Sequence, residues 1–290
     1  MTTLSVRHAR FGIQGPEAVE WIAGDAFRSQ FFNSFSMVFP VGERYFIDSL
    51  RGIAAEIADD ELRASVAAFI GQEASHRRMH SEYNQCLERL GLTNVSEKFV
   101  SWRIDHSGWL SPLDHLAITA GVEHFTTALG QGLLVSDDWL AGADARLEAL
   151  WKWHAAEEVE HGWIPLSVYR SLNGGYLRRL LWFLYVCVTL VLDIGVQTVM
   201  NLARSHHLWS LRTWRRGLAF LLGNRGPARC ALAAFCMYIQ PRYTPARPDS
   251  NSRASIWLRD NSRYFTLSRD RTDEGLASPP SEASQETPSK

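Results

Sequence analysis

Six glutamate and histidine side chains of this 290-residue chain have the types and the spacing of metal ligands. Two of the stretches that carry them read Glu-x-x-His, which places a carboxylate and an imidazole three residues apart on one face of a helix. Two further helical stretches each offer a single glutamate. Four carboxylates can neutralise two divalent cations inside an apolar four-helix bundle. The predicted metal ligands are Glu43, Glu73, His76, Glu123, Glu158 and His161.

The spacing of these ligands distinguishes them from ordinary surface charge. A single Glu-x-x-His is common on solvent-exposed helices, and surface charge is therefore the alternative interpretation. Here Glu73 follows Glu43 by 30 residues and Glu158 follows Glu123 by 35, as two similar helical hairpins would give. The same helical stripes also carry the apolar residues that must face the core. The pattern thus favours a buried site.

Two further histidines, His80 and His154, are candidate catalytic residues. Each lies one helical turn from a Glu-x-x-His ligand. If the connection over residues 92–110 crosses the bundle, the second and fourth helices run antiparallel and both histidines lie at one end of the site. They could then be extra ligands, proton donors or substrate contacts, with a structural role as the alternative. His124 points about 100° away from its neighbour Glu123, which indicates an indirect or structural role.

Helical periodicity and capping signals predict four long helices, which makes the fold all-α. The first is expected to begin near Pro40, whose fixed φ suits a first turn, and to end near Ile57. The connection over residues 92–110 is expected to be irregular. The second helix is expected to begin at Asp59 or Asp60, which are N-cap residues, and to end near Gly91. The third is expected to begin at Ser111-Pro112, with Asp114 in its first turn. The fourth runs through Leu147 and His161 and should be kinked at Pro165.

The net charge of −1 hides a strong asymmetry along the chain. Residues 1–193 carry 24 acidic and 16 basic side chains, whereas residues 194–248 carry eight arginines and no Asp, Glu or Lys. The apolar stretch 180–192 is short for a membrane span. Its extension to Met200 includes Asp193, whose charge would be costly near the centre of a bilayer. We therefore expect a helix packed on the bundle or attached to a membrane surface. No nucleic-acid-binding motif accompanies the arginines, which makes nucleic acid an improbable partner.

The chain divides into four expected parts. Residues 1–30 form an N-terminal extension, 31–175 the di-metal bundle, 176–240 an apolar and basic helical extension, and 241–290 a disordered tail rich in proline and serine. The four cysteines show no metal-type pairing, and the N-terminus lacks a basic-then-apolar signal segment. These features predict a cytoplasmic protein. Peripheral attachment at the inner face of the cytoplasmic membrane is compatible with that prediction.

Three segments of the sequence resemble a known family: Phe39-Pro-Val-Gly-Glu-Arg-Tyr-Phe46, Gln72-Glu-Ala-Ser-His76 and His154-Ala-Ala-Glu-Glu-Val-Glu-His161. They are similar to a bacterial family catalogued as predicted metal-dependent hydrolases, within the ferritin-like di-metal carboxylate superfamily. The resemblance covers about residues 25–240. It implies a role for each predicted ligand: terminal carboxylates at Glu43 and Glu123, bridging carboxylates at Glu73 and Glu158, and one imidazole per metal from His76 and His161. Glu157 and Glu160 lie next to these ligands on other faces of the helix, and we expect them to be solvated surface charge.

The superfamily uses this ligand set for di-iron oxygen chemistry, so the expected function is activation of dioxygen to oxidise an apolar or lipid-like substrate. An electron-donor protein would then be a partner. The first alternative is a metal-dependent hydrolase that uses Mn, Zn or Fe at the same site to activate water. The second is a non-catalytic iron-binding or storage protein. The sequence is also compatible with an anionic membrane surface as a partner and with assembly into a homo-oligomer.

Overall fold

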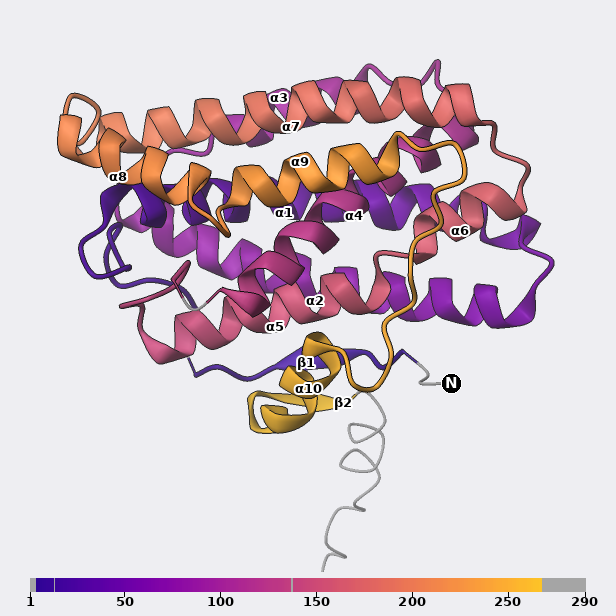
Figure 1. Cartoon of the computed structure of the whole chain (residues 1–290), viewed down its shortest axis with the longest axis horizontal. Helices are drawn as coiled ribbons and strands as arrows, with labels where there is room; N and C mark the ends of the chain where they lie inside the picture. The colour runs from indigo at the N-terminus through magenta and orange to yellow at the C-terminus, as the bar shows by residue number, and fades with distance from the viewer. Residues whose placement is uncertain (1–3, 13, 137, 268–290) are drawn as a thin grey trace, which may run out of the picture.

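The computed structural model describes residues 4–12, 14–136 and 138–267 (Figure 1). Within these residues nearly all regular structure is helical, and the all-α fold class is confirmed. The helices are α1 (Ala26–Arg51), α2 (Asp60–Arg89), α3 (Ser96–Asp105), α4 (Pro112–Val135), α5 (Ala145–His161), α6 (Ile164–Ser171), α7 (Tyr176–Arg204), α8 (Leu211–Leu222), α9 (Pro227–Tyr238) and α10 (Arg253–Asp260), with two 3-10 turns and the short strands β1 (Arg7–Ala9) and β2 (Phe265–Leu267).

Helix α1 begins much earlier than the sequence signals predicted. Its N-cap is Asp25, whose side chain accepts a hydrogen bond from the Arg28 N–H. Pro40 lies inside the helix, so the predicted start at Pro40 is wrong. The turns before Pro40 bury several phenylalanine side chains, and this packing stabilises helix where a proline alone would disfavour it. The helix ends at Arg51, and a 3-10 turn takes up the chain before Ile57.

The predicted boundaries of α2 and α4 are confirmed. The Asp59 side chain accepts hydrogen bonds from two N–H groups in the first turn of α2. Gly91, which follows the end of the helix, has a φ of +91°, a conformation that glycine adopts without strain. Ser111 and Asp114 form a reciprocal capping box at the start of α4, with Pro112 in the first turn.

The connection between α2 and α4 contains a helix that the sequence analysis missed. We expected residues 92–110 to be irregular, but α3 occupies Ser96–Asp105. Asn94 starts it, because its side-chain oxygen accepts a hydrogen bond from the Glu97 N–H and its amide donates to Met37 O. A capping signal at Asn94 was thus present, but α3 buries only Ser96 of its own residues, so its sequence carries no stripe of core-facing apolar residues.

The last helices follow the predicted breaks. Helix α5 ends at His161, and Pro165 stands in the first turn of the new helix α6, so the predicted kink is a break between two helices. Residues 223–226 separate α8 from α9, and Pro227 stands in the first turn of α9. Helix α7 packs lengthwise on α1 and α4 (Figure 1).

The C-terminal part is ordered further than predicted. Residues 241–290 were expected to be disordered, but α10 and β2 lie within them and pack on α5 and β1 respectively. Strand β2 pairs antiparallel with β1, with His8 opposite Thr266. Ala254 and Leu258 of α10 are buried in the main apolar cluster. The prediction of disorder is therefore wrong for residues 253–267, while residues 268–290 lie outside the described structure.

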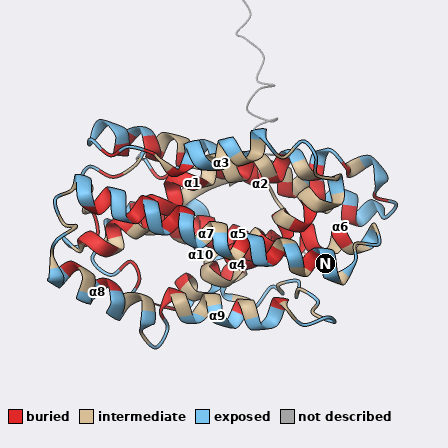
Figure 2. Ribbon diagram, turned by 90° about the horizontal axis from the view of Figure 1, so that it is seen from above, coloured by how far each residue is buried: buried red, intermediate tan, exposed pale blue. Residues whose placement is uncertain are grey.

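The apolar core forms two large clusters with a polar layer between them. Along α2, Phe69 belongs to one cluster and Met79 to the other, and the predicted ligands Glu73 and His76 lie between them. Along α1, Glu43 occupies the same intermediate position. Figure 2 shows that buried residues line the inner sides of the long helices. The fold therefore surrounds the predicted ligands with apolar packing at both ends.

Candidate metal centre

Helices α1, α2, α4 and α5 bring the six predicted ligands together, and all six side chains are buried. Within the described residues, sets of potential ligand atoms lie within 4.8 Å of one another. These sets are Glu73, Glu123 and His161; Glu73, His76 and Glu158; and Glu43, His76 and His154. The helical spacing thus placed the side chains correctly, and their role as metal ligands remains a prediction.

Glu73 and Glu158 occupy the middle of the cluster. Glu73 Oε1 lies 3.5 Å from His76 Nδ1 and 3.1 Å from His161 Nε2. Glu158 Oε1 lies 3.4 and 3.5 Å from the same two nitrogen atoms. Glu123 Oε2, by contrast, lies at the edge, 3.3 Å from His161 Nε2. A carboxylate between two imidazoles is placed to bridge two ions, which supports the bridging role of Glu73 and Glu158.

The buried atoms that lack hydrogen bonds reveal whether these residues fit metal ions. Both carboxylate oxygens of Glu43, Glu73 and Glu123 have no hydrogen-bond partner in the structure, and neither does Glu158 Oε2. The inward-facing nitrogens of three histidines share this property: His76 Nδ1, His154 Nε2 and His161 Nε2. Unpaired polar atoms in an apolar interior cost free energy, so their convergence needs a compensating partner. Two divalent cations would satisfy this set of oxygen and imidazole donors.

His154 contributes a third imidazole to the cluster. Its Nε2 atom lies 3.4 Å from Glu158 Oε1, and it groups with Glu43 and His76. One side of the site would therefore have two imidazoles, and the side with His161 would have one. Of the roles that the sequence left open for His154, an extra ligand fits this geometry best.

His80 lies behind His154, away from the cluster. His80 Nε2 is 3.0 Å from His154 Nδ1, and His80 Nδ1 is 2.9 Å from Ser36 Oγ. Because Ser36 donates its hydroxyl proton to Asn84 Oδ1, it accepts from His80, which in turn accepts from His154. This series of hydrogen bonds leaves the lone pair of His154 Nε2 facing the site. Glu73 lies beside His161 and His80 lies beside His154, so α2 and α5 run antiparallel.

The pKa shifts agree with this proton arrangement. Burial lowers the pKa of His80 to about 3. Burial, together with the nearby His76, also lowers the pKa of His154 well below its usual value. Both imidazoles are therefore neutral near pH 7, as the hydrogen-bond chain requires.

The other two imidazoles are held by residues of α2 and α5. His76 Nε2 donates to Glu157 Oε2 at 2.9 Å, and His161 Nδ1 donates to Gln72 Oε1 at 2.9 Å. Gln72 in turn donates to Glu160 Oε2 at 2.8 Å. Each ring thus uses one nitrogen for a protein partner and directs the other into the cluster, an arrangement typical of metal-ligating histidines.

Arg7 connects the partners of both rings, although no pattern in the sequence indicates this contact. Its guanidinium lies 3.0 Å from Glu157 Oε1 and 2.7 Å from Glu160 Oε2. The interpretation of Glu157 and Glu160 as solvated surface charge is therefore wrong, because β1 covers this side of α2 and α5. Ser75 Oγ, next to the predicted ligand His76, donates to the backbone oxygen of Arg7 and so holds the strand on α2.

His124 belongs to a different part of the molecule. Its Nε2 atom donates to Ala234 O at 2.8 Å, and Tyr243 Oη donates to its Nδ1 at 3.1 Å. The residue therefore joins α4 to α9 and to the segment after it, which agrees with the structural role considered for it.

The cluster holds protons when no cation is present. Burial raises the pKa of Glu43 well above its usual value, and Glu73 raises it further. Burial also raises the pKa of Glu123 to about 8, with a further contribution from Glu158. Burial opposes the charged form of His161, but Glu158 and Glu123 outweigh it and raise the pKa of this imidazole. Metal binding must displace these protons.

We therefore expect metal affinity to fall as pH falls. The folded-state pKa of Glu123 is about 8, so its protonated, non-ligating form is populated below that pH and must lose a proton on binding. Calorimetric titration of Mn²⁺ in buffers of different ionisation enthalpy measures both the affinity and the protons released. An affinity that does not change with pH, without proton release, would contradict these protonation states.

The two additional histidines should differ in their effects when replaced. His154→Ala should leave at least one metal bound but weaken the other and slow turnover, because an inward-facing donor is lost. His80→Ala should have the smaller effect, roughly 10- to 100-fold on affinity or activity, because it only releases the orientation of His154. Competition with a chelator and turnover of the metal-loaded protein test this order. Full activity in the double variant would assign both residues a purely structural role.

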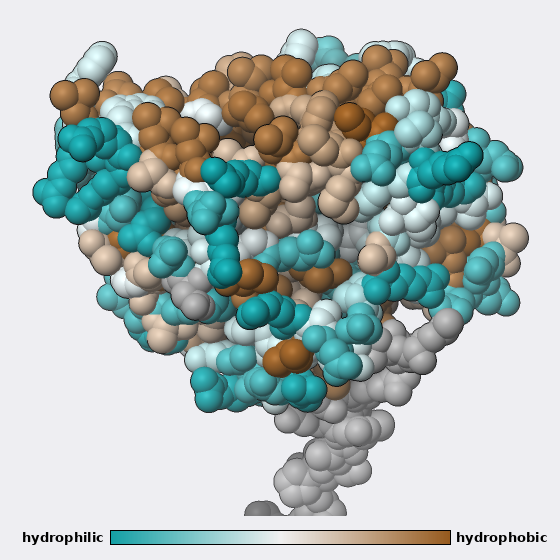
Figure 3. All heavy atoms as spheres, viewed as in Figure 1, coloured by the Kyte–Doolittle hydropathy of each residue, from teal (hydrophilic) through white to brown (hydrophobic). Residues whose placement is uncertain are grey.

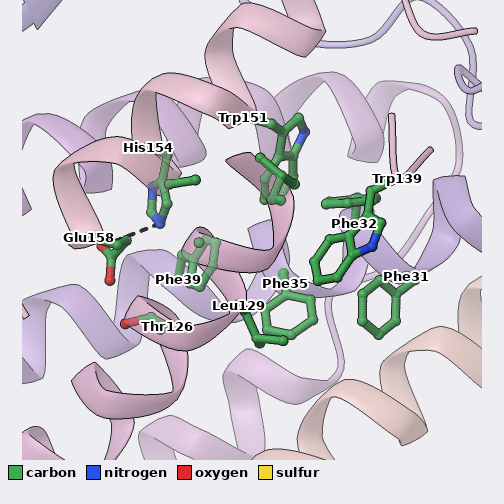
Figure 4. Close-up of a pocket in the computed structure, with 13 residues that line it drawn as sticks. Phe31, Phe32, Phe35, Phe39, Thr126, Leu129, Trp139, Trp151, His154 and Glu158 are labelled. Carbon is green, nitrogen blue, oxygen red and sulfur yellow. Dashed lines mark ion pairs between the residues drawn. The ribbon is translucent and has the colours of Figure 1, made fainter. Parts of the chain in front are cut away.

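An aromatic cavity adjoins the cluster. A cavity of about 50 Å³ lies beside His154 and Glu158 (Figure 4). Phe39 stacks on the His154 ring with a centroid distance of 4.6 Å. A second cavity of about 410 Å³, here called the chamber, lies between α1, α3, α4 and α7. Phe35, Phe39 and Thr126 line both cavities and so form the wall between them.

Three tryptophans border the predicted ligands of α5, and they occupy different positions around the site. Trp151 lines the small cavity. Trp153 packs edge-on against His76, with ring centroids 4.9 Å apart. Trp163 is covered by Arg247 on the other side of the site. Of the three, Trp151 is therefore the one that lines the small cavity beside the cluster.

Comparison with known proteins agrees with this description of the site. No significant match was found among curated proteins or among solved structures, so the ferritin-like relationship remains an interpretation. The sequence model of one family, described as predicted metal-dependent hydrolase, matches residues 5–249. The match includes Arg7 as well as all of the predicted ligands. Since it covers most of the chain, this protein belongs to the family of predicted metal-dependent hydrolases.

Proposed function

We propose that this protein is an enzyme with two divalent metal ions, which acts on an apolar organic substrate. The observation that carries the proposal is the convergence of buried, unpartnered carboxylate and imidazole atoms beside an aromatic cavity. Glu73 and Glu158 would bridge the ions. Glu43, His76 and His154 would complete one side of the centre, and Glu123 and His161 the other.

When bound, the ions would supply Lewis-acid activation of water or, as iron, electrons for the reduction of dioxygen. The surrounding residues would select the substrate. Phenylalanine, leucine and tryptophan side chains dominate the small cavity, and its polar side chains include Thr126, His154 and Glu158. Such walls exclude water and favour an apolar molecule that approaches through the chamber. Phe39 lies on that path, because it lines both cavities and stacks on His154.

Hydrolysis is the reaction that the family description supports. Mn, Zn or Fe would serve as the metal. Hydrolysis was the first alternative in the sequence analysis, and it now takes precedence over oxidation. A substrate with an ester or amide bond on an apolar chain would fit the aromatic walls. Neutral His154, fixed by His80, would keep one nitrogen available to the metal.

Dioxygen-dependent oxidation by two irons remains the second candidate. The observation that favours it is the donor set, since four carboxylates with imidazoles and without sulfur suit iron. An electron-donor protein would then be required. Iron storage explains less of the structure, because a chamber of about 410 Å³ with aromatic walls has no evident use in storage.

A pair of assays on the metal-loaded protein separates the candidates. The protein would be loaded anaerobically with Mn²⁺, Zn²⁺ or Fe²⁺ and tested for hydrolysis of p-nitrophenyl esters of increasing chain length and for oxygen consumption. Glu158→Ala serves as the control that lacks the bridging carboxylate. Hydrolysis lost in the control supports the first candidate, and oxygen consumption only with iron supports the second. Absence of both reactions with every metal would refute the proposed enzyme.

A further inference from the structure

Helix α7 has one face that the fold uses and one that it leaves exposed. On the inner face, Asp193 forms an ion pair with Arg103, and Gln197 Oε1 accepts hydrogen bonds from the backbone N–H groups of Val95 and Ser96. The outer face carries large apolar side chains at helical spacing, between 43% and 77% exposed. This α7 apolar face consists of Leu177, Leu181, Val188, Val191, Leu192 and Val196.

The apolar face continues over neighbouring elements. Figure 3 shows hydrophobic side chains gathered along the edge of the molecule where Figure 1 places α7. Seen from above, exposed residues follow α7 along its length, with α3 on one side and α8 and α9 on the other (Figure 2). Apolar patches of this extent on a folded protein indicate an interaction surface.

Length and composition would allow α7 to cross a membrane, but its contacts place it in another position. Among the described residues, α7 is the one helix that is long and apolar enough to cross a membrane, and 28% of its most apolar 18-residue stretch is buried inside the fold. The Asp193 and Gln197 contacts fix its inner face on α3. A helix held lengthwise on the protein can offer one apolar side to a membrane surface without crossing it.

The charges beside this face determine which partner fits it. Residues 194–248 contain eight arginines, all exposed, and no acidic residue. Helix α8 presents Arg212, Arg215 and Arg216 beside exposed Leu218, and Trp209, just before it, is 91% exposed. Arginine beside tryptophan and leucine matches a bilayer interface with anionic headgroups. Two copies of this face would instead bring like charges together, because a two-fold interface places each patch against itself.

The chamber opens at the side of the same face. Trp102 and Trp109, from α3 and the loop after it, line the chamber and are 59% and 78% exposed. Tyr185 of α7 also lines it and is partly exposed. The mouth therefore lies between α3 and α7, and the wall shared with the small cavity lies at its inner end.

We propose that the α7 apolar face and the basic side of α8 dock on an anionic lipid bilayer, and that the chamber takes its apolar substrate from that bilayer. Docking stands on the exposed apolar and basic residues alone. Delivery of substrate through the chamber rests on the proposed function, because it assigns the chamber to the reaction at the metal centre.

The docking test is flotation of the full chain with vesicles of phosphatidylcholine, alone or mixed with phosphatidylglycerol. We expect binding to the anionic vesicles that weakens as salt rises. The triple variant Arg212→Glu, Arg215→Glu, Arg216→Glu should bind roughly a hundredfold more weakly. The matched control is Arg253→Glu, Arg259→Glu, Arg263→Glu around α10, which lies on the opposite side of the molecule (Figure 1) and should leave binding unchanged.

Three results would overturn docking: no binding to anionic vesicles at low salt, an equal loss in both triple variants, or a stable dimer through this face that excludes vesicles. The delivery step has its own measurement. The α8 variant should lose turnover of a long-chain ester presented in anionic vesicles but retain turnover of a short, water-soluble ester. If the α8 variant turned over the long-chain ester in vesicles as well as the unsubstituted protein does, delivery of substrate through the chamber would be overturned. Vesicle binding by a protein without any turnover would leave docking intact and refute the proposed function.

Discussion

Glu73→Ala or Glu158→Ala should abolish binding of both metal ions, whereas Glu43→Ala or Glu123→Ala should mainly weaken one. Glu73 and Glu158 each lie within 3.5 Å of both His76 Nδ1 and His161 Nε2, so each would serve two ions. Removal of either of these carboxylates would therefore take a ligand from both ions at once, whereas removal of Glu43 or Glu123 would take a ligand from one. Elemental analysis after dialysis and calorimetric titration measure the stoichiometry.

Circular dichroism is the control for folding in these four variants. Each substitution places alanine, the best helix former, inside a long helix, so the metal-free variants should keep their helical content. If all four variants retained two tightly bound ions, the assignment of the site would be wrong. If each lost only one ion, the distinction between bridging and terminal carboxylates would be wrong.

Arg7→Met should destabilise the protein by about 3–5 kcal/mol, since removal of one partner of a buried ion pair leaves the other uncompensated. Arg7 is the cation beside both Glu157 and Glu160, and these hold His76 directly and His161 through Gln72. Metal affinity should also fall by about 10- to 100-fold. Denaturant unfolding of the metal-free protein and chelator competition measure the two effects separately.

Arg10→Met is the matched control for this substitution, because Arg10 lies on the same N-terminal segment with its side chain exposed. Its effect on stability should be within about 0.5 kcal/mol, as for other surface substitutions. Equal effects of the two substitutions would show that Arg7 has no particular role at the metal centre. A loss of stability without a loss of metal affinity would show that it acts on the fold alone.

The convergence of the predicted ligand side chains could be foreseen because it depends on local spacing. Three or four residues on a helix return to the same face whatever else the chain does, so Glu73 and His76 had to point together. The caps at Asp59 and Ser111 were predictable for the same reason, since a cap acts within one turn.

Long-range packing explains what the sequence did not show. Pro40 is a start signal in isolation, but the aromatic packing of the preceding turns extends α1 through it. Arg7 reaches Glu157 across 150 residues of sequence, and β1 is completed by β2 from the far end of the chain. Neither contact leaves a periodic pattern, because each strand has only three residues.

The most direct test of the metal centre is anomalous diffraction from crystals of the protein loaded with Mn²⁺ or Fe²⁺. We predict two anomalous peaks between α1, α2, α4 and α5, each bordered by both Glu73 and Glu158, with His154 at the peak nearer Glu43. A single peak that does not contact both of these carboxylates, or peaks elsewhere in a fully loaded protein, would contradict the two-metal centre.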